Sequence, residues 1–255
     1  MRVVVKIGSN VLTRSDGGLD ITSMSSIVDQ IAELRSKGVE VVLVTSGAVA
    51  SGKGELHLKK KEIESLDDVS ARQLFSSVGQ TKLMDKYFEL FREYHIIVGQ
   101  VLTMKENFES GEQYSNQRNC MEVMLANGVI PIINENDAVS ITELMFTDND
   151  ELSSLVALML KAEALVILSS VDGVFRDSAR TDLIREINPE DDFTSSIGND
   201  VSGAGRGGMQ SKYSVACKVA AAGTDVYVAN GRREGILSGI ILGKEDMVCT
   251  HFRKK

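Results

Sequence analysis

The chain has 255 residues, of which 43% are apolar and 25% are charged, a composition typical of a folded protein that is long enough for one large α/β domain. Its net charge of −8 at pH 7 argues against general nucleic-acid binding and against attachment to anionic membranes. No apolar run approaches the ~18 residues of a membrane-spanning helix, the N-terminus lacks a secretion-signal pattern, and the three cysteines form no close pair, so we expect a cytoplasmic protein.

Short runs rich in Val, Ile and Leu alternate with longer helical patterns along the chain. The runs predict strands at residues 3–7, 39–44, 96–102, 129–133, 165–168 and 225–228. The helical patterns cover residues 21–37, 70–94, 114–127, 151–162 and 209–222, and three of them are followed by the expected C-cap glycines Gly38, Gly128 and Gly223. This alternation predicts an α/β fold, a three-layer αβα sandwich with a mostly parallel open central sheet.

Two polar segments interrupt this pattern. Residues 52–64 and residues 191–204 are rich in charged and small polar side chains, and both are predicted to be loops. The first is expected to cover the site or to form a solvated face.

Polar and glycine-containing segments follow four of the predicted strands directly. They are residues 6–9, 45–48, 134–137 and 169–173. Ligands of open parallel sheets bind beyond the carboxyl ends of the strands. We therefore expect these four segments to meet at one edge of the sheet and to form the functional site there.

A glycine-rich segment, residues 205–212, opens the last predicted helix. Glycines allow close approach to a ligand, and the first turn of a helix offers free N–H groups and a positive dipole end. Lys212 adds a positive charge about one turn into the helix. The segment suits a phosphate group, and a flexible linker is the alternative interpretation. Lys6, at the end of the first strand and before Gly8, offers a second cation.

Five segments occurring in order resemble the amino acid kinase family, and within it the glutamate 5-kinases. They are Lys6-Ile7-Gly8-Ser9, Val44-Thr45-Ser46-Gly47-Ala48, Ile133-Asn134-Glu135-Asn136-Asp137-Ala138-Val139, Asp148-Asn149-Asp150-Glu151-Leu152-Ser153 and Gly207-Gly208-Met209-Gln210-Ser211-Lys212. The resemblance covers residues 1–250, and the third and fifth segments discriminate best. It implies transfer of the ATP γ-phosphoryl group to the γ-carboxylate of L-glutamate, the first step of proline biosynthesis.

The resemblance assigns phosphoryl transfer to three charged residues. Lys6 would lie between the transferred group and the β-phosphate, Lys212 would hold the phosphates, and Asp150 would orient both ammonium groups. Gly8, Gly47 and Gly208 would present backbone N–H groups to phosphate oxygens. The remaining nucleotide contacts would be Ser169, Ser170, Arg206, Gly207, Met209, Gln210 and Ser211. Asp150 is also a candidate N-cap for the helix at 151–162, whereas Asp148 is expected to be a solvated acid.

The same resemblance places the glutamate pocket at Ser46, Gly47, Asn134, Asp137 and Asn149. Asp137 would accept the α-ammonium, and Ser46 and Asn149 would donate to carboxylates, because a desolvated zwitterion needs partners for each charge. An Asx-rich turn is the alternative explanation of this loop.

The resemblance also implies partners and boundaries. ATP would come with Mg²⁺, for which we predict no protein ligand because no carboxylate cluster marks a cage. A homodimer or homotetramer is implied, with proline as feedback inhibitor. Residues 1–255 are expected to form one kinase domain, mainly glutamate-binding before about residue 160 and mainly ATP-binding after it. Many bacterial relatives continue into a PUA domain of the RNA-binding type, and this chain is expected to be a form without it.

Three details leave alternatives open. Ser169-Ser170 stand where the family usually has Thr-Asp, which leaves the base and ribose contacts undefined, and Arg206 stands where Thr is common.

N-acetylglutamate kinase and uridylate kinase are alternative functions within the same family. Asp137 argues against an acylated amine, and the lack of apparent arginines around the second substrate argues against a nucleotide acceptor. A silent amino-acid sensor would be expected to lack Lys6, Lys212 or Asp150, and all three are present.

Overall fold

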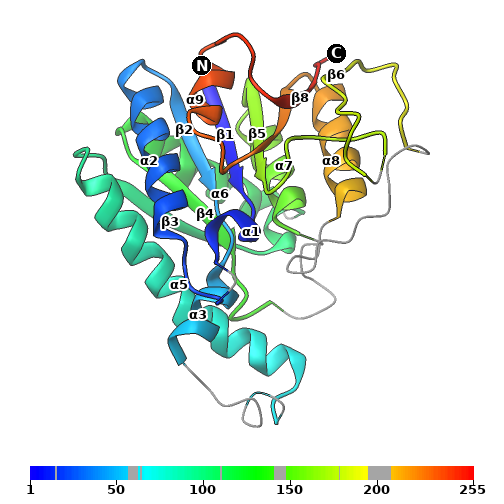
Figure 1. The fold of residues 1–255 in the computed structure, drawn as a ribbon. Coiled ribbons are helices and arrows are strands. Elements are labelled where there is room, and N and C mark those ends of the chain that lie inside the picture. Colours follow the sequence, from blue (N-terminus) through cyan, green and yellow to red (C-terminus); the bar gives the residue numbers. More distant parts are fainter. Residues whose placement is uncertain are drawn as a thin grey trace.

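A single mixed sheet organises the molecule, as the computed structural model in Figure 1 shows. The structure describes residues 1–14, 16–56, 63, 65–109, 111–140, 148–177, 179–194 and 208–255. Within these residues the sheet has eight strands in the order β3-β4-β2-β1-β5-β7-β8-β6. The strands are β1 (Arg2–Ile7), β2 (Glu40–Val44), β3 (Val98–Thr103), β4 (Ile130–Glu135), β5 (Ala164–Ser169), β6 (Glu186–Ile187), β7 (Asp225–Asn230) and β8 (Cys249–Phe252).

The predicted fold class is confirmed. All strand neighbours run parallel except β7 and β8, which pair antiparallel. The six predicted strands are present, while β6 and β8 were missed because two and four residues carry too little periodicity to be recognised.

The five predicted helices are present with bounds within three residues of those expected, and four shorter helices in the described residues were not predicted. In chain order the helices are α1 (Ser9–Leu12), α2 (Ile21–Ser36), α3 (Ala48–Leu56), α5 (Asp68–Arg92), the 3₁₀ helix η1 (Lys105–Phe108), α6 (Gly111–Ala126), α7 (Asn149–Met159), α8 (Met209–Ala221) and α9 (Ile236–Ile241). Gly38, Gly128 and Gly223 have φ between 76° and 96°, so they end their helices in the left-handed conformation as predicted. None of the described helices is long and apolar enough to cross a membrane.

The prediction of a loop at residues 52–64 is wrong at its start. Residues 52–56 form the end of α3, whose short apolar stretch gave too weak a pattern to predict a helix. Residues 57–62 and 64 lie outside the described residues, as do residues 195–204 of the second predicted loop.

Alternation along the buried strands separates two apolar cores. Val3, Val5 and Ile7 of β1 pack in one core with residues of α2, α5 and α9. Val4 of the same strand points to the other core, which contains residues of α6, α7 and α8. The central strands are therefore covered on both faces, and polar groups at their carboxyl ends are left at the edge of the sheet.

Two glycines bring α3 and α5 into direct backbone contact beyond the carboxyl ends of the strands (Figure 1). A Cβ atom at Gly79 would lie 1.8 Å from the carbonyl oxygen of Ala48, and one at Gly52 would lie 1.8 Å from that of Phe75. Neither approach leaves room for a side chain. This packing holds α5 at a fixed distance from the loops that follow β2 and β4.

We predict that Gly79→Ala destabilises the protein, although alanine is favoured over glycine by about 1 kcal/mol inside a helix. The added methyl group has to displace backbone, and overpacking of this kind costs roughly 1–3 kcal/mol or more. Urea denaturation should show a lower midpoint with an unchanged slope. Gly111→Ala is the matched control, because a Cβ there meets nothing within 4 Å. An undiminished midpoint for Gly79→Ala would contradict the close packing.

Candidate active site

The functional candidates gather where the carboxyl ends of β1, β2 and β4 meet the N-terminus of α7. They form two neighbouring groups. The lysine–aspartate cluster consists of Lys6, Asp150 and Lys212, and the polar pocket consists of Ser46, Arg72, Asn134, Glu135, Asp137 and Asn149. Asn149 and Asp150, which open α7, belong to one group each, so the two groups are adjacent.

Asp150 joins two lysines that come from opposite ends of the chain. Lys6 Nζ lies 2.7 Å from Asp150 Oδ1, and Lys212 Nζ lies 2.9 Å from Asp150 Oδ2. The aspartate is fully buried, and the side chains of Lys6 and Lys212 are only 6% and 12% exposed. The geometry agrees with the predicted arrangement, in which one carboxylate orients both ammonium groups.

The charge of Asp150 follows from a balance of two effects. Burial by itself raises the pKa of this carboxyl, but the ammonium groups of Lys6 and Lys212 outweigh it and hold the pKa below its ordinary value. Asp150 is therefore ionised throughout the neutral range, as its predicted role requires.

Asp148, and not Asp150, caps α7. Its Oδ1 accepts hydrogen bonds from the backbone N–H groups of Asp150 and Glu151, and its Oδ2 accepts one from Ser211 Oγ at 2.8 Å. The expectation of a solvated acid at this position is thus wrong. Because Ser211 lies in the first turn of α8, Asp148 ties the starts of α7 and α8 together and holds Asp150 opposite Lys212.

The start of α8 offers the predicted anion-binding geometry. Gly208 is the N-cap in an extended conformation with no side-chain cap, so the first-turn N–H groups of Met209, Gln210 and Ser211 precede the first intrahelical bond, Lys212 N–H to Gly208 O. Gln210 also lines a separate groove of about 530 Å³ on the side of α8, together with Tyr213 and Cys217. Arg206 and Gly207 lie outside the described residues.

The predicted role of Gly8 is corrected. Its backbone N–H donates to the carbonyl oxygen of Leu168 at 2.9 Å, which leaves it unavailable for a phosphate. Gly8 instead keeps the turn beside Lys6 tight, since a Cβ there would lie 3.2 Å from that same carbonyl oxygen. Gly47 has φ of +96°, a conformation that requires glycine, and it places the chain between Ser46 and α3. Ser169 is half-buried at the end of β5, and Ser170 is exposed beside it.

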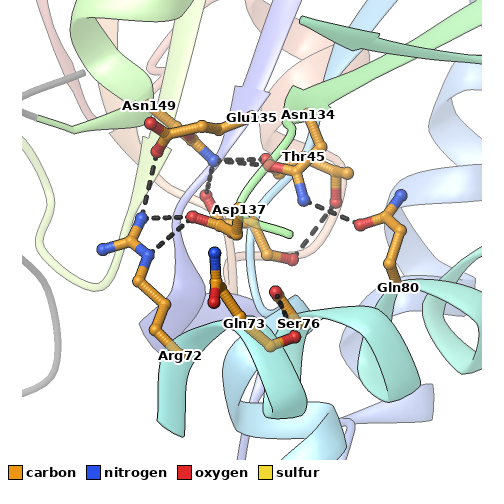
Figure 2. Close-up of polar contacts among 10 residues, drawn as sticks. Thr45, Arg72, Gln73, Ser76, Gln80, Asn134, Glu135, Asp137 and Asn149 are labelled. Atoms are coloured by element: carbon orange, nitrogen blue, oxygen red, sulfur yellow. Dashed lines mark hydrogen bonds and ion pairs between the residues drawn. The ribbon is translucent and has the colours of Figure 1, made fainter. Parts of the chain in front are cut away.

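Asn149 holds the polar pocket together (Figure 2). Its Nδ2 donates to Ser46 Oγ at 2.9 Å and to Asn134 Oδ1 at 3.0 Å, and it also contacts the carbonyl oxygen of Thr45 at 2.6 Å. Asn134 Nδ2 in turn donates to Gln80 Oε1 of α5 at 2.8 Å. Both amides are thereby engaged with protein oxygens, so the amide of Asn149 positions its neighbours in addition to any contact with a substrate.

Arg72 is the residue that the sequence analysis missed. It reaches from α5 to Asp137 and Glu135, the two buried acids of the pocket, and its Nε donates to Asp137 Oδ1 at 2.7 Å. The structure thus places an arginine in the pocket that the sequence analysis expected to bind glutamate, where no arginine was apparent from the sequence. A signal was present: Arg72, Ser76 and Gln80 recur every four residues, which places the three polar side chains on one side of α5.

No group of three acidic, histidine or cysteine residues that could hold a metal ion occurs in the part of the chain that the structure describes. The prediction of no protein ligand for Mg²⁺ is left untested by this observation.

We predict that Asp150→Asn lowers the free energy of unfolding by about 3–5 kcal/mol at pH 7, because two buried ammonium groups lose their carboxylate. The folded-state pKa of Asp150 lies below its unfolded value, so its stabilisation is present above the ordinary carboxyl range and disappears as the pH falls through the folded pKa. The stability gap between wild type and variant should narrow between about pH 5 and pH 3. Urea unfolding at several pH values measures this difference in the free energy of unfolding, with Asp16→Asn as control, because Asp16 forms an exposed pair with Arg14.

A difference between wild type and Asp150→Asn that does not change with pH would contradict the lowered pKa of Asp150.

Comparisons with known proteins agree with this geometry. Residues 1–230 match the amino acid kinase family. The chain is 56% identical over 98% of its length to a glutamate 5-kinase of Bacteroides thetaiotaomicron, of which it covers 69%. It is 45% identical to that of Chlorobaculum tepidum, covering 66% of it, and 40% identical to that of Symbiobacterium thermophilum, covering 93% of it.

Solved structures support the fold. An isopentenyl phosphate kinase in complex with substrate superposes with a TM-score of 0.67 at 17% identity, and covers 99% of this chain and 100% of its own. A UMP kinase of Bacillus anthracis superposes with a TM-score of 0.66 at 18% identity, with 100% and 96% coverage. Together with the cluster of Lys6, Asp150 and Lys212 at the carboxyl edge of the sheet, these matches lead to one conclusion: the chain belongs to the amino acid kinase family.

Proposed function

We propose that the protein transfers the γ-phosphoryl group of ATP to the γ-carboxylate of L-glutamate and so catalyses the first step of proline biosynthesis. The observation that carries the proposal is the buried cluster in which Asp150 joins Lys6 and Lys212 beside a polar pocket. Relatives with up to 56% identity are named glutamate 5-kinase, which supports the choice of substrate.

The chemistry needs alignment more than acid–base catalysis. A carboxylate is already a nucleophile at neutral pH, so one of its oxygens attacks the γ-phosphorus while the bond from that phosphorus to the bridging oxygen breaks, and ADP leaves with the electron pair. An anion thereby attacks a polyanion, and positive charge at fixed positions lowers the barrier. Lys6 and Lys212, held by one buried carboxylate, supply that charge without reorganisation. Mg²⁺ bound to the ATP phosphates would neutralise further charge.

The two parts of the chain divide the substrates in this proposal. Residues up to about 160 supply the polar pocket, in which Asp137 receives the α-ammonium and Ser46 and Asn134 face the amino acid. Residues 160–255 bind ATP through Ser169, Ser170, the 206–211 segment and the start of α8. The free first-turn N–H groups of α8 next to Lys212 support this division.

The acceptor is tested by ATP-dependent hydroxamate formation, because hydroxylamine traps an acyl phosphate. We expect a signal with L-glutamate and none with N-acetyl-L-glutamate or L-aspartate, since acylation removes the ammonium and a shorter chain leaves the carboxylate away from Lys6. Lys6→Ala, checked for folding, provides the background. A signal confined to N-acetyl-L-glutamate would overturn the role of Asp137. Because Arg72 lies in the pocket, UMP is included, with ADP release as readout, and turnover of UMP alone would replace the proposed substrate.

We further propose that the protein is a cytoplasmic homodimer or homotetramer that is inhibited by L-proline. Proline shares the α-ammonium and α-carboxylate of glutamate, so the same pocket suits it. Apolar side chains exposed near the edge strand β3 support association: Phe88 of α5 is 48% exposed, Ile97 is 68% exposed and Val123 of α6 is 52% exposed.

Sedimentation equilibrium at micromolar concentration should therefore give a mass above that of one chain. Ile97→Asp places a charge on the proposed contact and should shift the protein toward the monomer. The control is Met1→Asp, also at an exposed apolar position, in a chain with an extra initiator methionine in front of it, and it should leave the oligomer's mass unchanged. A monomer at all concentrations would contradict the proposal.

A further inference from the structure

The guanidinium of Arg72 contacts two carboxylates through Nε and Nη2, and its Nη1 donors are not used in these contacts. Its Nε donates to Asp137 Oδ1 at 2.7 Å, and its Nη2 contacts that same oxygen and also Glu135 Oε2 at 3.0 Å. Arg72 Nη1 makes no hydrogen bond within the described residues, and Figure 2 shows it pointing away from both carboxylates. The side chain is 19% exposed, so Nη1 is within reach of a ligand.

Only one of the two carboxylate oxygens of Asp137 contacts Arg72. Both contacts from Arg72 fall on Oδ1, and Oδ2 has no hydrogen-bond partner in the part of the chain that the structure describes. The side chain is 9% exposed, and Oδ2 is not one of the fully buried oxygens without a partner, so it is accessible to a ligand. A vacant donor on Arg72 and a vacant acceptor on Asp137 are thus fixed in one ion pair, a combination complementary to the carboxylate and ammonium of an α-amino acid.

L-glutamate makes a specific demand on this arrangement. Its γ-carboxylate has to reach the lysine–aspartate cluster, so its α-carboxylate needs a second cation. We propose that Arg72 binds the α-carboxylate through Nη1, while Nε and Nη2 hold Asp137 so that Oδ2 receives the α-ammonium. This assignment rests on the proposed function and adds to it the residue that recognises the α-carboxylate.

The surroundings hold Arg72 in place for this role. Gly79 and Gly52 fix α5 against α3, and Gln80 of α5 accepts a hydrogen bond from Asn134 near the end of β4, the strand that leads into the loop with Asp137. The arginine fork is thereby oriented before substrate binds, which reduces the entropy lost on binding. A lysine has a single point of charge and cannot hold two carboxylates and a third anion in one plane.

Two analogues of L-glutamate separate this role from a structural one. Glutarate lacks the ammonium, whereas 4-aminobutyrate lacks the α-carboxylate, and both are measured as competitive inhibitors against L-glutamate. Arg72→Gln should raise the glutamate KM and the glutarate inhibition constant about 100-fold, because a charge-assisted contact to a carboxylate is lost, and should leave the KM for ATP unchanged. The constant for 4-aminobutyrate should rise much less than that for glutarate, because its ammonium group contacts Asp137 and depends on Arg72 only through the orientation of that carboxylate.

Three further variants complete the design. Arg72→Lys should recover part of the glutarate affinity, and Asp137→Asn should weaken 4-aminobutyrate more than glutarate. Arg14→Gln, at an exposed arginine paired with Asp16, should change neither constant. Thermal unfolding of each variant reports on folding.

The outcomes separate the two proposals. Wild-type protein that forms no hydroxamate with L-glutamate would overturn the proposed function. If the wild type is active, an Arg72→Gln variant that weakens glutarate and 4-aminobutyrate equally, or that leaves the glutamate KM unchanged, would overturn the role of Arg72 alone.

Discussion

The buried carboxylate of Asp150 is the constraint on which the site depends. Two ammonium groups, Lys6 of β1 and Lys212 of α8, lie within 3 Å of its two oxygens. Without this carboxylate, two cations at such depth would repel each other and face a large desolvation cost. The interaction therefore forces β1, α7 and α8 together at one point, and this is the point at which a phosphoryl group needs positive charge.

A second set of contacts transmits this order to the polar pocket. Asp148 caps α7 and binds Ser211, and thereby sets the angle at which α7 presents its first turn. Asn149, one residue before Asp150, then binds Ser46 in the loop that follows β2 and Asn134 near the end of β4. One helix start thus fixes both halves of the site. The distance between them follows from backbone geometry and needs no flexible side chain.

The helix pair α3 and α5 closes the pocket from the other side. The two glycines at its crossing allow α5 to bring Arg72 and Gln80 to the end of β4, which carries Asn134, and to the loop after it, which carries Asp137. The pocket is consequently lined by charges and amides that are satisfied mainly by one another. An arrangement of this kind changes little on binding, because the substrate replaces water at oriented donors and acceptors.

The sequence by itself determined the sheet and the edge at which the site lies. Buried strands such as residues 3–7 are apolar nearly throughout, and the lysine, glycines and Asx residues that follow them stand out against that background. These local patterns predicted six strands, five long helices, and Lys6 and Lys212 as two cations for one phosphate site, whereas the pairing of both lysines with Asp150 was implied by the resemblance to the amino acid kinase family. They also gave the C-cap glycines, because a left-handed residue after a helix is itself a local feature.

Only the tertiary structure decided which polar groups meet. Arg72 lies 63 and 65 residues from Glu135 and Asp137, and the spacing of polar residues along α5 does not indicate which side chains it contacts. Asp148 is the N-cap of α7 and also accepts a hydrogen bond from Ser211, and the N–H of Gly8 donates to the carbonyl oxygen of Leu168 on the neighbouring strand. Helix and strand formation depends on neighbours in the sequence, whereas partners for buried charges depend on distances that exist only after the layers have packed.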